Sequence, residues 1–176
     1  PIIIVAVLTI VTFKYVKDND IDIKDYIEES ATVKGTIGDT LSGDDVKITL
    51  TDALIYPRIE GEAFTDTPAE GKEYLVFFFN VENIDDENNF VSIHNFTGYV
   101  DDTLVASKIL INNVDNVQYL SADLTPGKKA RGYVAYEVDT NWKQFDIHYK
   151  ENSFDYNDSM IFTVVNEENN QNNNNA

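Results

Sequence analysis

Cysteine is absent from the sequence and basic residues are scarce: 13 lysines and arginines stand against 31 aspartates and glutamates, for a formal net charge of −18. The lack of cysteine excludes disulfide scaffolds, cysteine-ligated zinc, iron–sulfur clusters and thiol nucleophiles. Because so much negative charge repels polyanions in general, the composition also argues against a nucleic-acid partner. A chain of 176 residues, 43% of them hydrophobic, is long enough for one domain with terminal extensions.

The most hydrophobic segment is too short to span a membrane by itself. It extends over 12 residues, from Ile2 to Phe13, whereas a transmembrane helix needs about 20, a length that a few residues upstream would supply. No small-x-small cleavage site follows it, so we expect residues 1–16 to be an uncleaved hydrophobic membrane anchor rather than the remnant of a cleaved signal. A buried strand is a third interpretation of the same β-branched run.

Two polar segments flank the predicted domain. Residues 17–37 are rich in aspartate and glutamate and predict an acidic, solvated linker, although Ile23, Tyr26 and Ile27 also fit one short amphipathic helix. Residues 166–176 contain seven asparagines in eleven positions. Because this tail has no apolar face to bury, we expect it to be disordered.

Between residues 38 and 165 the hydrophobic side chains recur with a period of two, which is typical of β-strands. In VKITLTDALIY (46–56), apolar and polar residues alternate from the first position. KEYLVFFFNVEN (72–83) is apolar on both faces, which predicts a central strand that is covered on both sides. RGYVAYEVD (131–139) and WKQFDIHYK (142–150) also alternate, and the weaker strand candidates are residues 90–100, 104–111, 117–124 and 160–165.

Turn signals separate these segments at intervals of about ten residues. The clearest is Thr125-Pro126-Gly127-Lys128, where proline in the second position and glycine in the third specify a type II turn. Short strands joined by such turns favour an all-β fold over a βαβ architecture. We therefore predict an immunoglobulin-like antiparallel β-sandwich of about seven to eight strands over residues 38–165.

Three stretches of the predicted domain resemble a known family: IGDTLSGDDVKITLTDA (37–53), GKEYLVFFFNVEN (71–83) and, most specifically, LTPGKKARGYVAYEVD (124–139). The family comprises uncharacterised extracytoplasmic domains of Gram-positive bacteria, called telokin-like or immunoglobulin-like, that occur on lipoproteins and membrane-anchored surface proteins. The resemblance implies a surface-exposed domain and points to no catalytic residue, because the shared motifs are strands and turns. This chain has no cysteine to carry a lipid, which leaves the segment from Ile2 to Phe13 as its visible anchor.

His94 and His148 are the only imidazoles available for acid–base chemistry. Neither a G-x-S-x-G elbow nor an H-E-x-x-H motif is present, so we expect both to be ordinary surface or core residues. Adjacent loop carboxylates such as Asp44-Asp45 point in different directions and are expected to keep the surface soluble rather than to cleave glycosidic bonds. We therefore expect no enzymatic activity and assign no catalytic or cofactor-binding residues.

Calcium is the one metal for which the loops offer suitable oxygen ligands. Asp85, Asp86, Glu87 and Asn88 follow one another in the turn segment IDDENN and are candidate calcium ligands. The EF-hand pattern is absent and no glycine shapes the loop, so calcium is an option rather than an expected cofactor. We expect no other cofactor.

Trp142 is the only tryptophan, and we expect it in the core of the sandwich. The alternative is an exposed aromatic platform for a carbohydrate or a peptide. A binding site is expected at a sheet face or a loop end, because a sandwich without a deep cleft recognises partners with loops and exposed strand edges.

The sequence thus predicts an extracytoplasmic, membrane-tethered immunoglobulin-like module with a non-enzymatic interaction or structural role. It would be located on the extracellular face of the cell membrane, anchored or secreted. Its expected partners are the membrane, through the N-terminal segment, and a cell-surface protein or an envelope polymer. The alternatives are a calcium-dependent adhesion domain and, less favoured, a hydrolase of cell-envelope polymers.

Overall fold

The computed structural model describes residues 32–151 and 160–167. The predicted anchor (1–16), the predicted linker up to residue 31 and the predicted tail from residue 168 lie outside the described residues, and the expectations for them stay predictions. No helix in the described part of the chain is long and apolar enough to cross a membrane.

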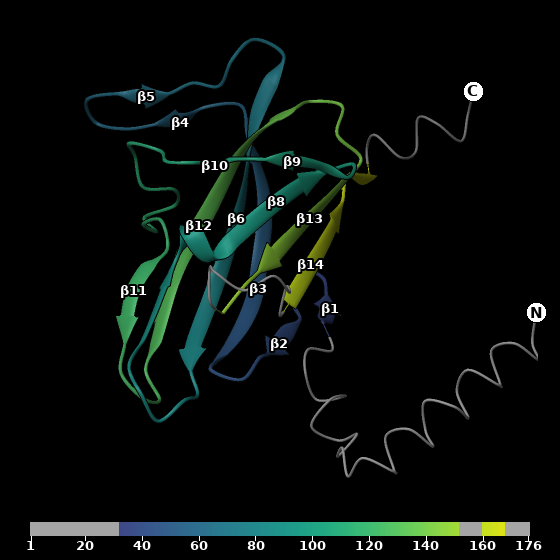
Figure 1. Cartoon of the computed structure of the whole chain (residues 1–176). Helices are drawn as coiled ribbons and strands as arrows, with labels where there is room; N and C mark the ends of the chain where they lie inside the picture. Colours follow the sequence, from purple (N-terminus) through teal and green to yellow (C-terminus); the bar gives the residue numbers. More distant parts are fainter. Residues whose placement is uncertain (1–31, 152–159, 168–176) are drawn as a thin grey trace, which may run out of the picture. The chain divides into compact units, whose positions relative to one another are not determined.

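Two five-stranded sheets form the domain (Figure 1). Sheet A has the strand order β1-β14-β13-β8-β9, with the bounds Val33–Gly35, Met160–Val165, Gln144–Tyr149, Phe96–Val100 and Thr103–Val105. Sheet B has the order β10-β12-β6-β3-β2, with the bounds Ser107–Lys108, Lys129–Asp139, Lys72–Asn83, Val46–Tyr56 and Thr40–Ser42. Two ribbons complete the fold: β11 (Ser121–Leu124) with β7 (Asn89–Ser92), and β4 (Ile59–Glu60) with β5 (Thr65–Asp66). The predicted all-β class is confirmed. Among the strands that the structure describes, β1 and β14 are the one pair that runs parallel, and an isolated parallel bridge joins Tyr119 to Tyr133.

The strands with the clearest period of two form where the sequence predicts them. In β3, Val46 and Ile48 are buried while Lys47 between them is exposed. In β6 the residues from Tyr74 to Phe79 are all buried, because β6 lies between β3 and β12 and both of its faces are covered there. The strand whose residues are apolar on both faces therefore lies at the centre of sheet B, as predicted.

Aromatic rings fill the space between the two sheets. Phe77 of β6 lies 4.8 Å from Phe145 of β13, measured between ring centroids. Trp142 is 2% exposed and belongs to the same cluster, and its Nε1–H donates a hydrogen bond to Oε1 of Glu73 (3.0 Å). The predicted core position of the tryptophan is therefore confirmed, and an exposed tryptophan platform is excluded.

A second hydrophobic cluster covers the upper half of the outer face of sheet B, the face that points away from sheet A. Side chains from β6 and β12 form its base, and side chains from β4 and from the connection between β10 and β11 lie over them. The buried members are Tyr74, Val76, Phe78, Tyr133, Ala135, Ile59, Leu110 and Val114. The hydrophobic face of β6 that points outward is therefore buried by the chain itself.

Hydrogen bonds hold the covering connection in place. Tyr133 Oη donates to the carbonyl of Asn112 (3.1 Å), and Asn112 Nδ2 donates to the carbonyl of Phe64 (3.0 Å). The connection then reaches the edge of β12, where the Leu120 N–H donates to the carbonyl of Tyr133 (2.8 Å). A Cβ atom on Gly132 would lie only 2.6 Å from Leu120 Cα, so a glycine is needed where the chain turns into the main core.

The weaker strand predictions differ from the structure in detail. Residues 90–100 form two strands, β7 and β8, separated by a 3₁₀ turn at Ile93–Asn95. The turn forms because Ser92 Oγ accepts a hydrogen bond from the His94 N–H (3.3 Å) and Asn95 Oδ1 accepts one from the Ser92 N–H (3.0 Å). Residues 104–111 yield only the short strands β9 and β10, because the chain then leaves the sheet to cover the second cluster.

Two further features define the lower end of the domain. β1 lies within the segment predicted as linker, yet it pairs with β14, so sheet A begins before residue 38. The predicted type II turn is confirmed, since Gly127 has a φ of 73° and the Lys128 N–H donates to the carbonyl of Thr125 (3.0 Å).

Candidate functional site

The lower half of the outer face of sheet B is polar and exposed. Outward side chains of β2, β3, β6 and β12 lie there in two rows that cross the strands. The register aligns Ser42, Lys47, Glu82 and Lys129 in the first row and Thr40, Thr49, Asn80 and Arg131 in the second. Residues that are far apart in the sequence thereby form one continuous surface.

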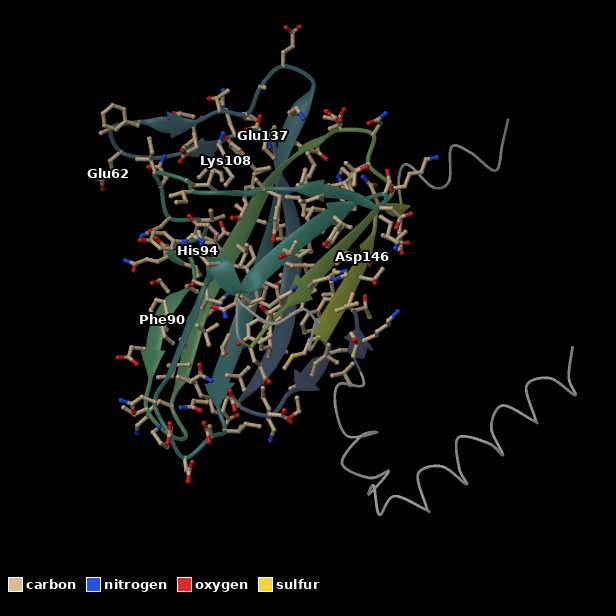
Figure 2. All side chains as sticks on the ribbon, in the orientation of Figure 1. Glu62, Phe90, His94, Lys108, Glu137 and Asp146 are labelled. Atoms are coloured by element: carbon tan, nitrogen blue, oxygen red, sulfur yellow. The ribbon has the colours of Figure 1, made fainter. Side chains whose placement is uncertain are left out.

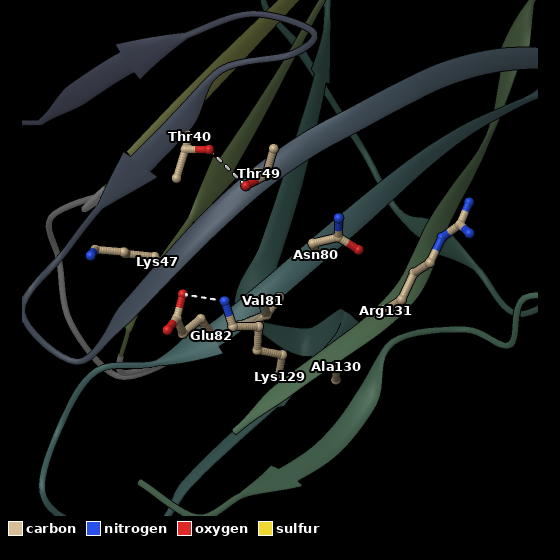
Figure 3. Close-up of a pocket in the computed structure, with 9 residues that line it drawn as sticks. All are labelled: Thr40, Lys47, Thr49, Asn80, Val81, Glu82, Lys129, Ala130 and Arg131. Atoms are coloured by element: carbon tan, nitrogen blue, oxygen red, sulfur yellow. Dashed lines mark hydrogen bonds and ion pairs between the residues drawn. The ribbon is translucent and has the colours of Figure 1, made fainter. Parts of the chain in front are cut away.

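An open hollow of about 430 Å³ lies over these rows (Figure 3). Two contacts order its side chains. The hydroxyl oxygens of Thr40 and Thr49 lie 2.8 Å apart in a hydrogen bond, and Lys129 Nζ lies 3.0 Å from Glu82 Oε2. The surface therefore has a defined arrangement of hydroxyl, ammonium and carboxylate groups.

Positive charge is concentrated on this surface. We call Lys47, Lys129, Arg131 and Glu82 together the cationic strip. Glu82 pairs with Lys129, whereas neither Lys47 nor Arg131 has a carboxylate within ion-pair distance among the residues that the structure describes. The strip thus has three positive charges against one negative charge, in a chain whose net charge is −18.

Two other hollows lie elsewhere on the domain. One, of about 420 Å³, is on the outer face of sheet A and is lined by Tyr99 and His148 among others. The second, of about 460 Å³, follows the seam between β3 and β14, where Ile55 and Val165 are exposed beside the buried Trp142. All three hollows are open, unlike the enclosed pockets in which most enzymes hold a small substrate.

A protein-family model matches residues 35–171, a range that contains every residue of the cationic strip. The family is described as a domain of unknown function, DUF4352. The chain belongs to this family. No curated protein matches the sequence of this DUF4352 chain.

Several solved structures resemble the DUF4352 domain. The ycdA protein of Bacillus subtilis, described as a candidate lipoprotein, is 15% identical with a TM-score of 0.57 over 77% of this chain, which spans 41% of the length of ycdA. A candidate lipoprotein from Staphylococcus aureus is 16% identical with a TM-score of 0.52, over 74% of this chain and 90% of that one. An uncharacterised β-sandwich protein from Clostridium difficile is 12% identical with a TM-score of 0.51, over 78% of this chain and 97% of that one. At these identities the likeness shows the fold alone.

The predicted calcium ligands, residues 85–88, lie in the turn between β6 and β7 of the DUF4352 domain. Asn83, which is fully buried, organises this turn. Its Nδ2 donates to the carbonyls of Glu87 and Leu124 (2.8 Å each), and its Oδ1 accepts from the Asp85 N–H (3.0 Å). The turn is thus held by an amide side chain.

Within the described ranges, 32–151 and 160–167, no three histidine or carboxylate side chains converge in a way that could hold a metal ion. Groups of the predicted ligands hydrogen-bond within the turn itself: the Asp86 N–H donates to Asp85 Oδ1 (2.7 Å), and the carbonyl of Glu87 accepts from Asn83 Nδ2. Calcium at Asp85, Asp86, Glu87 and Asn88 stays a prediction.

Carboxylates crowd together at this end of the domain, around Asp45 and Glu151. Glu151 Oε1 accepts a hydrogen bond from the Asp45 N–H (3.0 Å). Burial is the main cause that raises the pKa of Glu151; backbone hydrogen bonds from Asp45 and Val46 act to lower it, and repulsion from the carboxylates of Asp45 and Asp44 raises it further. Burial is also the main cause that raises the pKa of Asp45. Negative charge on these acids therefore opposes folding near neutral pH.

The two histidines lie on different elements. His94 is exposed in the 3₁₀ turn between β7 and β8 (Figure 2). His148 lies in β13 on the outer face of sheet A, where its ring centroid is 4.7 Å from that of Tyr99. The two imidazoles are therefore positioned by different elements of the fold.

The cationic strip was not among the functional residues predicted from the sequence. Lys47, Lys129 and Arg131 each occupy an outward position of an alternating strand, which is a visible signal for exposure. Their proximity depends on the order β12-β6-β3, which brings Lys47 close to Lys129, a residue 82 positions later in the sequence. A strand order of this kind cannot be deduced from alternation alone.

Proposed function

We propose that this chain is an extracytoplasmic module, tethered to the membrane by its N-terminal hydrophobic segment, that binds a partner at the cell surface and catalyses no reaction. The observation that carries the proposal is the exposed polar half of sheet B. It presents ordered hydroxyl, amide and charged groups on a broad open surface, and the packing of the domain makes little use of them.

An envelope location is supported by the kind of proteins that share the fold. Two of the similar structures belong to candidate lipoproteins. The resemblance to telokin-like or immunoglobulin-like extracytoplasmic domains agrees with that location. Its tether would be the hydrophobic segment from Ile2 to Phe13, and the acidic residues that follow would hold the domain away from the membrane surface.

A binding role rather than catalysis is supported by the shape of the three hollows. Each is open to solvent, whereas acid–base and nucleophilic catalysis use groups that converge on a substrate shielded from water. Broad, open sheet faces are instead typical of surfaces that recognise proteins or polymers.

Protease accessibility in whole cells tests the location. The full-length protein is expressed in its native host with a C-terminal epitope tag, and intact cells are treated with a protease that cannot cross the membrane. We expect the domain to be digested in intact cells and to remain with the membrane fraction after an alkaline carbonate wash. Protection in intact cells, followed by digestion after lysis, would refute an extracytoplasmic domain.

The tether is tested in the same host with a variant that lacks residues 2–13. We expect the variant to leave the membrane fraction while the full-length protein stays in it. A variant that stays bound to the membrane would show that another part of the protein makes the attachment.

A further inference from the structure

We propose that the cationic strip binds an anionic polysaccharide, an inference that rests on the proposed function and names the partner of its polar surface. The strip consists of Lys47, Lys129, Arg131 and Glu82 on three adjacent strands of sheet B. Three features of the strip support this inference: the positive charge that it leaves unpaired, the spacing of its charged groups, and the neutral polar groups between them.

Unpaired positive charge is the first feature of the strip. The ammonium group of Lys129 is paired with Glu82, but Lys47 and Arg131 have no carboxylate within ion-pair distance in the described part of the chain. At physiological ionic strength, exposed charges farther away than about 8 Å are largely screened. A charged polymer at the strip therefore responds mainly to local positive charge, while the acidic remainder of the protein disfavours other modes of binding.

The spacing of the charged groups is the second feature of the strip. Strands in a sheet lie about 4.8 Å apart, so Lys47 on β3 and Lys129 on β12, on either side of β6, are separated by about 10 Å at the backbone. Arg131 lies one row higher, about 7 Å along β12 from Lys129. A small anion such as phosphate needs donors that converge on one point. Charges spread over such distances fit a chain with repeated anionic groups.

The neutral polar groups between the cations are the third feature of the strip. Thr40, Thr49 and Asn80 supply hydroxyl and amide groups in the row that contains Arg131, and these can donate to and accept from sugar hydroxyls (Figure 3). None of the described residues that line this hollow is aromatic. Proteins that bind single-stranded nucleic acid stack bases on aromatic rings, so the strip fits a polysaccharide better than a single-stranded nucleic acid.

The fold also explains why this surface is free. The connection between β10 and β11 covers the upper half of the same sheet face and then turns inward at Gly132, one residue above Arg131. Below this level the outward residues of β6 change from Phe78 to Asn80 and Glu82. The strip thus occupies the part of the face that needs no cover.

The test measures binding of dextran sulfate and of uncharged dextran to the full-length protein in a neutral detergent. The two polymers share one backbone and differ in charge. We expect the protein to bind dextran sulfate only. The logarithm of the association constant should decrease linearly with the logarithm of the salt concentration, as it does for other polyelectrolytes. Equal binding of both polymers, or no binding of dextran sulfate, would overturn the proposal.

A matched pair of variants locates the site. Lys47→Gln with Arg131→Gln removes two charges from the strip, and Lys34→Gln with Lys143→Gln removes two exposed charges elsewhere, so both proteins have the same net charge. We expect the strip variant to bind dextran sulfate at least tenfold more weakly and the control variant to change less than twofold. Equal weakening in both variants would show that only net charge matters and would refute the strip as the site.

Two further ligands separate polysaccharide from other anionic partners. Poly-L-glutamate represents acidic polypeptides, and vesicles of phosphatidylglycerol represent an anionic lipid surface. We expect both to bind more weakly than dextran sulfate at equal charge concentration, and tighter binding of either would overturn the polysaccharide assignment. A protein that is extracellular by protease accessibility but does not bind dextran sulfate would refute this inference and leave the proposed function standing.

Discussion

Replacing Val76 by alanine tests whether the second hydrophobic cluster stabilises the domain as a true core does. Val76 is fully buried on the outer face of β6, beneath Leu110 and Val114 of the covering connection. The change removes two methyl groups, and each contributes about 0.8 kcal/mol when buried. Because the site also retains part of the cavity, we expect the free energy of unfolding to decrease by about 2 to 3 kcal/mol.

Two control variants provide the comparison for this decrease in the free energy of unfolding. Val134→Ala makes the same change in the main core between the sheets, where Val134 is also fully buried, and should cost a similar amount. Asn80→Ala lies on the same face and strand as Val76 but in the exposed half, and should change the stability by less than about 0.5 kcal/mol. Urea unfolding followed by circular dichroism measures all three variants, with an unchanged m-value expected in each.

A loss at Val76 no larger than the loss at Asn80 would refute this account of the fold. It would mean that the outward face of β6 is in water throughout and that the connection between β10 and β11 does not cover it. In that case the free surface of sheet B would extend beyond the cationic strip, and its upper half would be apolar. The measurement therefore tests the extent of the proposed binding surface as well as its stability.

Other consequences of the structure can be measured on the same protein. Because Trp142 is 2% exposed and is the only tryptophan, its fluorescence should be blue-shifted and poorly quenched by iodide, and a red-shifted, freely quenched signal would contradict its core position. Asn83→Ala removes three side-chain hydrogen bonds from a buried turn, those to the carbonyls of Glu87 and Leu124 and the one from the Asp85 N–H, which keeps only its bond to the carbonyl of Asp45 (3.2 Å). We therefore expect a loss of about 2 to 4 kcal/mol in urea unfolding, and a loss below about 1 kcal/mol would show that the turn does not depend on this side chain. The pKa of Glu151 is raised in the folded state, so its protonation contributes a stability that is complete below its unfolded value of 4.5 and is lost as the pH rises through the folded value. Lowering the pH from 7 towards 4.5 should therefore stabilise the wild-type protein more than Glu151→Gln, while the exposed control Glu62→Gln should behave like the wild type. If calcium binds at residues 85–88, calorimetric titration of the metal-free protein gives heat and a higher Tm, and the absence of both would end that prediction.

Alternation in the sequence was sufficient to predict the long strands. In β3, Val46, Ile48 and Leu50 are buried at every second position, and a change of phase would expose this whole apolar set, so the alternation predicts which face is buried. The apolar outer face of β6 further predicted a central strand with cover on both sides. The type II turn at Pro126-Gly127 was equally predictable, because it depends on two adjacent residues whose backbone preferences are strong.

Local hydrogen bonds and distant contacts explain what the sequence did not predict. Residues 90–100 alternate like one strand, but the short polar side chains of Ser92 and Asn95 bind the backbone and form a turn in the middle. Leu110 and Val114 read as part of a strand and a loop, and their role as cover becomes visible only when β6 and β12 are adjacent. The strip depends on the same long-range pairing, which the alternation of a single strand does not encode.

The outward residues of β6 therefore divide the face of sheet B into a part that stabilises and a part that is free to bind. An apolar side chain on an outer face has to be covered by other residues, and the covered part of the face can then bind no partner. From Tyr74 to Phe78 the outer face of β6 is covered in this way. From Asn80 onward the outward residues are polar, so the sheet gains nothing from a cover and the surface stays open. The boundary coincides with Gly132 on the neighbouring strand, where the covering chain turns into the core. Moving the polar residues upward along β6 would extend the binding surface only by removing apolar contacts that stabilise the fold, which is the physical limit on the size of this site.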